Sequence, residues 1–171
     1  MRRAPGIPHI DIFLFTLYVH APVSAALIYR FTREVGYSEN QYLRSIHLLK
    51  ERGYFTLMKR NIYEVEHELF YVDPTWNLHV DPPTRPREPR LDLLLIVLSG
   101  DHTPRAAFVR LWGGAVGDPG AVYQRARREL PRYGYIEDDG HWRYYPGPRA
   151  EWLRKLGRGE AAIPPSPLQN I

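Results

Sequence analysis

The chain of 171 residues contains no cysteine, and its lysines are few: Lys50, Lys59 and Lys155, against 20 arginines. Without cysteine there is no disulfide framework, thiolate nucleophile or cysteine-based metal site. Long apolar runs are also missing, since no stretch reaches the roughly 18–20 residues that a membrane-spanning helix requires. The net charge of +4, carried almost wholly by arginine, favours a polyanionic partner.

The first 26 residues are similar to a secretory signal, with Arg2 and Arg3 followed by an apolar run at residues 10–19. Asp11 and His20 interrupt this pattern, however, and residues 91–98 repeat it deep inside the chain. A segment that is copied into the interior is better explained as a structural helix. We therefore predict a cytoplasmic protein that does not enter a membrane.

The sequence repeats itself at an offset of 81 residues. Between Pro8 and Val65, 14 of 58 positions are identical to the residue 81 positions later. Composition alone would give roughly three or four matches, so the repeat indicates a duplicated unit of about 80 residues. The identical pairs include Asp11/Asp92, Arg44/Arg125, Gly53/Gly134 and Tyr54/Tyr135.

Each unit is predicted to be α+β, with three helices followed by a β-hairpin. In the first unit, Ser38 and Gln41 form a capping-box pattern at the start of the third helix, and Gly36 and Gly53 follow helices as C-terminal glycines do. The predicted helices span residues 8–20, 23–35 and 38–52. Strands are predicted at 54–58 and 62–72, around a turn at Lys59, Arg60 and Asn61.

The second unit is predicted to follow the same order, with helices at 91–99, 104–112 and 119–133. Its strands surround residues 138–140, where Asp139-Gly140 is a strong turn signal. Residues 81–90 contain four prolines and predict an extended linker. A short closing helix is predicted at 149–156. The domains are therefore 1–80 and 91–156, followed by a flexible tail at 157–171.

Residues 38–55, SENQYLRSIHLLKERGYF, resemble the recognition helix and first wing strand of winged-helix regulators of the MarR and PadR types. Residues 49–55 are the most typical part, and residues 130–136 are their counterpart in the second unit. The resemblance implies two tandem winged-helix domains, each with three helices and a β-hairpin wing. The tandem plan is also similar to the bacterial condensin subunit ScpB and to plasmid replication initiators.

A helical wheel places the core side of each third helix opposite a polar side. In the first unit, Tyr42, Ile46 and Leu49 are predicted to face the core, and Asn40, Arg44, His47 and Glu51 fall opposite. In the second unit, Tyr123, Ala126 and Leu130 take the core side, which leaves Arg125, Arg128 and Arg132 in an outer row.

These outer residues have the chemistry that reads DNA. In the major groove, arginine makes two hydrogen bonds to guanine, and asparagine or glutamine makes two to adenine. Basic residues neutralise phosphates. The basic turn of the first hairpin suits a minor-groove or phosphate contact. The candidate DNA-binding residues are Asn40, Gln41, Arg44, His47, Lys59, Arg60, Asn61, Arg125, Arg128 and Arg132.

The two units are not predicted to bind alike. Glu137, Asp138 and Asp139 would repel phosphate at the second hairpin, which leaves that unit to bind phosphates by its helix alone or to bind protein. The many aromatic residues of the strands are assigned to the core or to the contact between units rather than to a stacking surface. Trp142, beside a turn, is the aromatic residue most expected to be exposed.

Enzyme chemistry finds no support in the sequence. The seven histidines lack the spacing of a metal site, and residues 113–117 lack the lysine and hydroxyl residue of a phosphate-binding loop. Because no serine-centred nucleophile elbow is present either, we expect no catalysis, no cofactor and no metal.

The sequence therefore predicts a double-stranded DNA-binding protein, most plausibly a transcriptional regulator, which could also form a homodimer. One alternative is an adaptor that binds protein partners in chromosome segregation, favoured by the acidic second hairpin, the aromatic residues and the proline-rich ends. The other is a plasmid or phage replication initiator, which shares the tandem plan and the basic helices.

Overall fold

The computed structural model describes residues 5–20, 22–63, 65–72 and 88–161, without the side chains of 56, 60–62, 65–67 and 71. The chain divides into two compact units. The first comprises the described parts of 1–76 and 152–171, and the second those of 77–151. Both combine helices with a small antiparallel sheet, so the predicted α+β class is confirmed.

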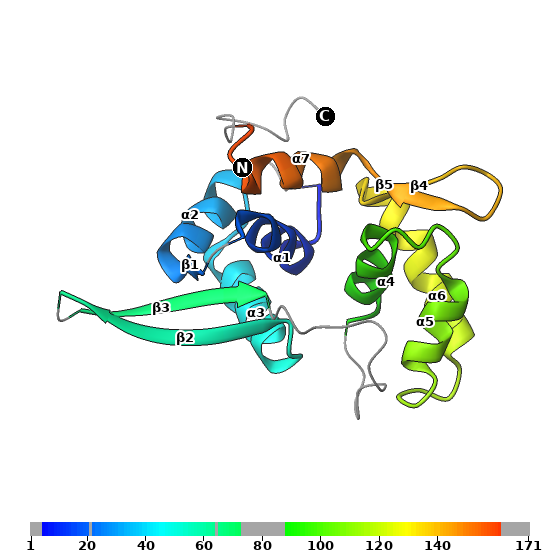
Figure 1. The fold of residues 1–171 in the computed structure, drawn as a ribbon, viewed down its shortest axis with the longest axis horizontal. Helices are drawn as coiled ribbons and strands as arrows, with labels where there is room; N and C mark the ends of the chain where they lie inside the picture. The colour runs from blue at the N-terminus through cyan, green and yellow to red at the C-terminus, as the bar shows by residue number, and fades with distance from the viewer. Residues whose placement is uncertain (1–4, 21, 64, 73–87, 162–171) are drawn as a thin grey trace. The chain divides into compact units, whose positions relative to one another are not determined.

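Helix α1 (Pro8–Val19) forms the centre of the first unit, and it is apolar on all sides (Figure 1). A helix of this kind must be surrounded by other elements. Residues His9 to Thr16 are accordingly all buried, and Pro8 occupies the first turn, where its missing N–H costs nothing. The predicted end at His20 is correct within one residue, because His20 caps the helix in a left-handed conformation.

Helices α2 (Ala25–Val35) and α3 (Glu39–Glu51) both begin at serine caps, of which the sequence predicts only Ser38. The Ser24 hydroxyl accepts from Leu27 N, and Ser38 with Gln41 forms a complete capping box. Gly36 ends α2 with a φ of 111°, a backbone conformation that favours glycine.

A three-stranded sheet of order β1-β3-β2 completes the first unit. It contains β1 (Val23–Ser24), β2 (Phe55–Ile62) and β3 (Val65–Val72). The two long strands form a twisted hairpin that extends away from the helices of this unit (Figure 1). Strand β1 was not predicted, because two residues directly before a helix cap carry no pattern of alternation.

The predicted turn at Lys59, Arg60 and Asn61 is wrong. These three residues lie within β2, where they pair with Glu68, His67 and Glu66 of β3. Ile62 pairs with Val65, so the chain reverses between these two residues. The prediction placed the turn at the most polar residues, whereas a hairpin exposed to solvent on both sides accepts polar residues along its whole length.

The core of the first unit is aromatic. The Phe15 ring stacks on Phe31 with centroids 4.2 Å apart, and Phe13 meets the edge of Tyr54 at 5.7 Å. Phe55 and Phe70 join the hairpin to the helices from the adjacent ends of β2 and β3. Strand aromatics at these positions fill the core, as the sequence predicts.

The second unit contains α4 (Pro89–Leu98), α5 (Arg105–Trp112), α6 (Pro119–Glu129) and the 3-10 helix η1 (Leu130–Tyr133). The predicted α-helix at 119–133 is thus too long. Pro131 lacks an amide hydrogen and its ring would clash in a continuing α-helix, so the last turn takes the tighter 3-10 form. Gly134 then ends it with a φ of 76°.

A two-stranded sheet of β4 (Ile136–Asp138) and β5 (Tyr144–Pro146) follows, and helix α7 (Pro148–Gly157) closes the chain. The closing helix is confirmed, but from Trp152 onwards it belongs to the first unit rather than to the second. Gly157 lies so close to α1 that an added Cβ would stand 2.6 Å from the Tyr18 Cβ.

Other predicted boundaries shift or cannot be compared. The linker was predicted to reach Arg90, yet α4 already begins at Pro89 with Glu88 as its cap. Linker residues 81–87 and tail residues 162–171 lie outside the described residues. Among the helices that the structure describes, none combines the length and apolar character needed to cross a membrane.

Candidate nucleic-acid interface

Helix α3 presents its predicted outer face to solvent. Ile46 and Leu49 are buried on the inner side, whereas Asn40 and Arg44 are exposed one turn apart. Within the described part of the chain, Arg44 has no carboxylate partner. Its five N–H donors are therefore available to a planar acceptor such as a guanine edge or a phosphate.

Two other predicted residues of α3 are engaged within the helix. The Gln41 side-chain oxygen accepts from Ser38 N at 2.8 Å, so Gln41 serves the capping box, and its role as a base contact stays a prediction. His47 Nε2 lies 2.9 Å from Glu51 Oε2, in an i,i+4 pair on the helix surface. A helical wheel shows which residues share the outer face, but it does not show which of them pair with each other along the helix.

Leu43 and Lys50 are two residues of this face that the prediction omitted. Leu43 is 55% exposed, and Lys50 is exposed one turn before the helix ends. Both follow the same spacing as Asn40 and His47, so helical periodicity could have found them. An exposed leucine beside an asparagine and an arginine offers an apolar contact to a groove in addition to the polar ones.

Of the three residues predicted to form the basic turn of the first hairpin, Lys59 is the one whose side chain the structure describes. Lys59 is exposed, but it stands directly opposite Glu68 in the strand register, and residues opposite one another share one face. The side chains of Arg60 and Asn61 lie outside the described residues. At the hairpin end, Tyr63 is 96% exposed with a φ of 50°, although it was assigned to the core.

The arginine row of the second unit is shorter than predicted. Arg125 and Arg128 are exposed on α6, with Arg128 Nε donating weakly to Gln124 O at 3.4 Å. Arg132 is exposed but lies on η1. Only Arg125 and Arg128 therefore lie on the α-helix that was predicted to carry all three arginines.

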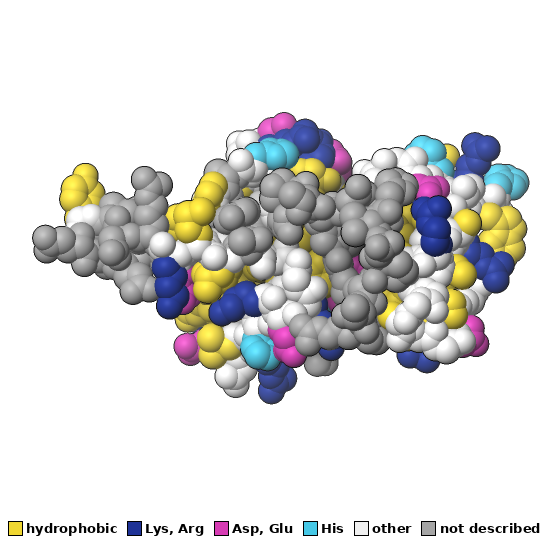
Figure 2. All heavy atoms as spheres, turned by 60° about the horizontal axis from the view of Figure 1, so that its bottom comes forward, with side chains coloured by type: hydrophobic (Ala, Val, Ile, Leu, Met, Phe, Trp, Pro, Cys, Tyr) yellow, Lys and Arg dark blue, Asp and Glu magenta, His cyan; other side chains and the backbone are white. Residues whose placement is uncertain are grey.

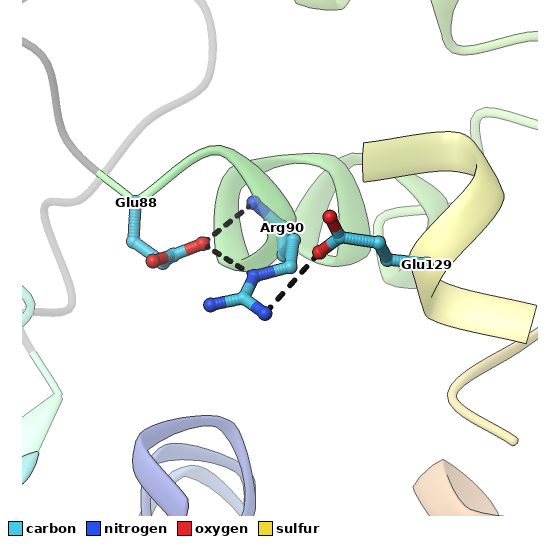
Figure 3. Close-up of polar contacts among 3 residues, drawn as sticks. All are labelled: Glu88, Arg90 and Glu129. Atoms are coloured by element: carbon cyan, nitrogen blue, oxygen red, sulfur yellow. Dashed lines mark hydrogen bonds and ion pairs between the residues drawn. The ribbon is translucent and has the colours of Figure 1, made fainter. Parts of the chain in front are cut away.

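Beside Arg125 lies an open pocket of about 280 Å³, lined mainly by charged side chains. Arg90 is one of its lining residues, with Nε 3.0 Å from Glu88 Oε1 and Nη1 3.2 Å from Glu129 Oε2 (Figure 3). Burial lowers the pKa of Arg90, but its hydrogen bond to Glu88 and the charges of both carboxylates outweigh burial and raise it. The two carboxylates weaken the attraction of this region for phosphate.

The loop between β4 and β5 is ordered by its acidic residues. Asp138 Oδ1 accepts from Gly140 N at 2.8 Å, and Asp139 Oδ1 accepts from His141 N at 2.7 Å and Arg143 N at 3.2 Å. The hydrogen bond from His141, with that from Arg143 and the charges of both residues, lowers the pKa of Asp139. These carboxylates stabilise the backbone of the loop, a role that their charge alone does not predict.

Trp142 stands at the end of this loop and is 69% exposed, as predicted. Its backbone is left-handed, with a φ of 67°. The Arg127 guanidinium lies over its ring, 5.1 Å from the centroid, and Arg127 Nε also donates to the Tyr144 hydroxyl. Arg127 therefore connects α6 to the loop, a contact that the sequence does not reveal.

Charges of both signs are mixed over the face drawn in Figure 2. Among the described side chains drawn there, lysine and arginine occur in small separate groups next to acidic and apolar ones. In the described residues no group of three or more histidine or acidic side chains could hold a metal ion. Any contact of this face with an anion would therefore rest on a few specific side chains.

Comparison of the chain with known protein families, with curated proteins and with solved structures gives no match.

Proposed function

We propose that this protein binds double-stranded DNA without catalysis, with α3 of the first unit as the principal reading helix. The observation that carries the proposal is the exposed pair of Asn40 and Arg44 at the start of an outward-facing helix. A helix with its side chains fits the major groove, where asparagine forks to adenine and arginine to guanine. Reading from the first turns of the helix is the usual geometry of such domains.

The arrangement of the first unit supports a winged-helix assignment. Three helices precede a long hairpin, and the short β1 between α1 and α2 completes the sheet as a third strand. We propose that α3 enters the groove and that the β2–β3 hairpin is the wing. Lys59, within β2 rather than at its turn, is then a phosphate contact along the wing.

The second unit also has three α-helices before a hairpin, but the 3-10 helix η1 follows the third, the described residues between α4 and α5 form no strand, and the hairpin is much shorter. Both Asp11 and Asp92 are fully buried, in agreement with the sequence repeat. We propose that this unit is a second winged-helix domain and that Arg125 and Arg128 bind phosphates rather than bases. Transcriptional regulation is the activity that two such units suit, since two units can occupy neighbouring half-sites.

A protein-binding adaptor remains the competing proposal, and specific observations favour it. Leu27 and Tyr29 on α2 are exposed together with Leu43 on α3, and charges of both signs are mixed on the face of Figure 2. A replication initiator would use the same helices on a different DNA target. Salt separates the adaptor from both DNA-binding proposals, because binding to phosphates releases counterions.

The test is a fluorescence-anisotropy titration of random-sequence duplex DNA by the full chain at increasing salt. We expect binding at low salt that weakens linearly on a logarithmic scale, with a slope of roughly −0.9 for each phosphate neutralised. Arg44→Ala should weaken binding, whereas Arg30→Ala is the matched control because Glu34 already holds Arg30 at 2.8 Å. Absence of binding at low salt, or equal effects of the two variants, would overturn the proposal.

A further inference from the structure

The β4–β5 loop displays an exposed aromatic ring, Trp142, and neither α3 nor the proposed phosphate contacts Arg125 and Arg128 explain it. Most bulky residues avoid a φ of 67°, which costs free energy unless surrounding contacts enforce it. Here Asp139 supplies those contacts through the N–H groups on either side of Trp142. The loop is thus built to hold Trp142 outward, although burial would be the more favourable place for an indole.

The ring is also held from one side. Arg127 lies over it at 5.1 Å, and Arg127 is itself fixed by Tyr144 and by Gln124 Oε1 at 3.3 Å. The hydrogen bond to Tyr144 raises the pKa of Arg127, so the guanidinium stays charged. Because Trp142 remains 69% exposed beside this partner, most of its surface is open to a planar ligand.

We infer that Trp142 is a stacking platform for an unpaired nucleobase of single-stranded DNA. Every base has an aromatic face, and stacking on a protein side chain requires no particular sequence. A ring that is already fixed loses little conformational entropy when a base stacks on it. The exposed His141 and Arg143 on either side can contact the flanking phosphates.

The acidic residues of the second hairpin are consistent with binding of an unpaired base rather than a duplex. Asp138 and Asp139 would repel the closely spaced phosphates of a duplex, which is why this hairpin is a poor duplex wing. Their carboxylates accept hydrogen bonds from the backbone of the loop, which carries the exposed Trp142 ring. The inference extends the proposed function by giving the second unit unpaired bases, at an overhang or an opened duplex end.

The test compares three DNA probes: an oligothymidylate, a blunt duplex, and the same duplex with a thymidine overhang. Trp142→Gly is the decisive variant, because glycine adopts the left-handed backbone freely and removes only the ring. We expect it to weaken binding of the oligothymidylate and of the overhang by roughly 5- to 150-fold, the range that stacking of one base supports. Trp142→Tyr should retain most of the affinity.

Two further readouts separate stacking from a structural role. Stacking should quench the Trp142 emission, which is isolated as the difference between wild type and Trp142→Phe. The factor lost in Trp142→Gly should also be the same at about 50 and about 200 mM salt, since stacking releases few counterions. Leu27→Ala, an exposed apolar residue of α2, is the matched control and should change neither readout.

The outcomes distinguish this inference from the proposed function. If blunt duplex is bound and depends on Arg44, but Trp142→Gly binds the overhang like wild type, the inference is overturned and the proposed function stands. If blunt duplex is not bound while oligothymidylate quenches the Trp142 emission, the inference stands and the proposed binding of double-stranded DNA is overturned. If neither probe binds, both are overturned and a protein partner is favoured.

Discussion

The Tyr37 hydroxyl donates a hydrogen bond of 2.5 Å to Asp11, and both residues are buried. Asp92, 81 positions after Asp11, is buried in the same way but accepts from Trp112 Nε1 at 2.9 Å. The repeat thus retains a carboxylate in the first helix of each unit, while its aromatic donor comes from a different position. Burial of a carboxylate is costly without such donors, so each aromatic partner is required for stability.

Tyr37→Phe tests this requirement. It removes the hydroxyl and should lower the free energy of unfolding by about 1.5–3 kcal/mol, because the bond is made to an ionisable group in the interior. Tyr42→Phe is the matched control, since the Tyr42 hydroxyl makes only a 3.3 Å bond to Ala25 O. Urea unfolding followed by circular dichroism measures both, and equal losses would contradict the assigned role of Tyr37.

Gly53 ends α3 with a φ of 81° and has open space around its Cα. Gly53→Ala should therefore destabilise the protein by about 1–2 kcal/mol through backbone strain alone, without a clash. Gly117 also has open space but no positive φ, so Gly117→Ala should be neutral or stabilising by up to about 1 kcal/mol. A comparison of the two thermal midpoints gives the result, and a neutral Gly53→Ala would show that the conformation is not strained.

Arg44 and Arg128 should differ in what they contribute to DNA binding. Arg44→Ala should cost about 1–3 kcal/mol on preferred sequences and relax the preference, as expected for a residue that contacts a base edge. Arg128→Ala should weaken binding by a similar factor on all sequences and make the salt slope smaller by about one phosphate. Binding to a pool of random duplexes, sequenced after selection, measures both effects, and wild-type behaviour of both variants would show that the wrong surface was chosen.

Tyr123 should make the second unit sensitive to alkali. Burial, together with the charge and the hydrogen bond of Tyr144, raises the pKa of Tyr123 to about 12 from its usual 10.0. The folded state holds this proton more tightly than the unfolded state. Its contribution to stability is therefore complete below pH 10 and is lost as the pH rises towards 12.

The check is the urea midpoint between pH 9 and 12 for wild type and Tyr123→Phe, since roughly this interval contains both titrations. Wild type should lose more stability than the variant over this interval. Tyr133→Phe, which alters a more exposed phenol, should follow wild type. Parallel curves for wild type and Tyr123→Phe would show that the Tyr123 phenol titrates alike in both states.

Helix positions in this protein could be predicted because their signals are local. The cap pair of Ser38 and Gln41, the glycines after α2 and α3, and the apolar spacing of α1 all act within a few residues. Strand positions were harder to place. Lys59, Arg60 and Asn61 resemble a turn in composition, yet the pairing of β2 with β3 continues through them because register depends on the partner strand.

The candidate site was predicted only in part for the same reason. Asn40 and Arg44 point outward as the helical wheel requires, because burial of the opposite side determines the orientation of the whole helix. Arg132 lies outside the α-helix that was predicted to carry it, because Pro131 changes the helix type before it, and Gln41 also serves a backbone cap.

By itself, the sequence determined the repeat of 81 residues, the α+β class, the helices with their caps, and the outward face of α3. These features depend on residue types at short spacings, where backbone hydrogen bonding and apolar periodicity dominate. Tertiary structure alone decided that Tyr37 donates to Asp11, that Glu129 pairs with Arg90, and that Arg127 supports Trp142. Each of these contacts joins separate elements, and their geometry exists only once the elements pack together.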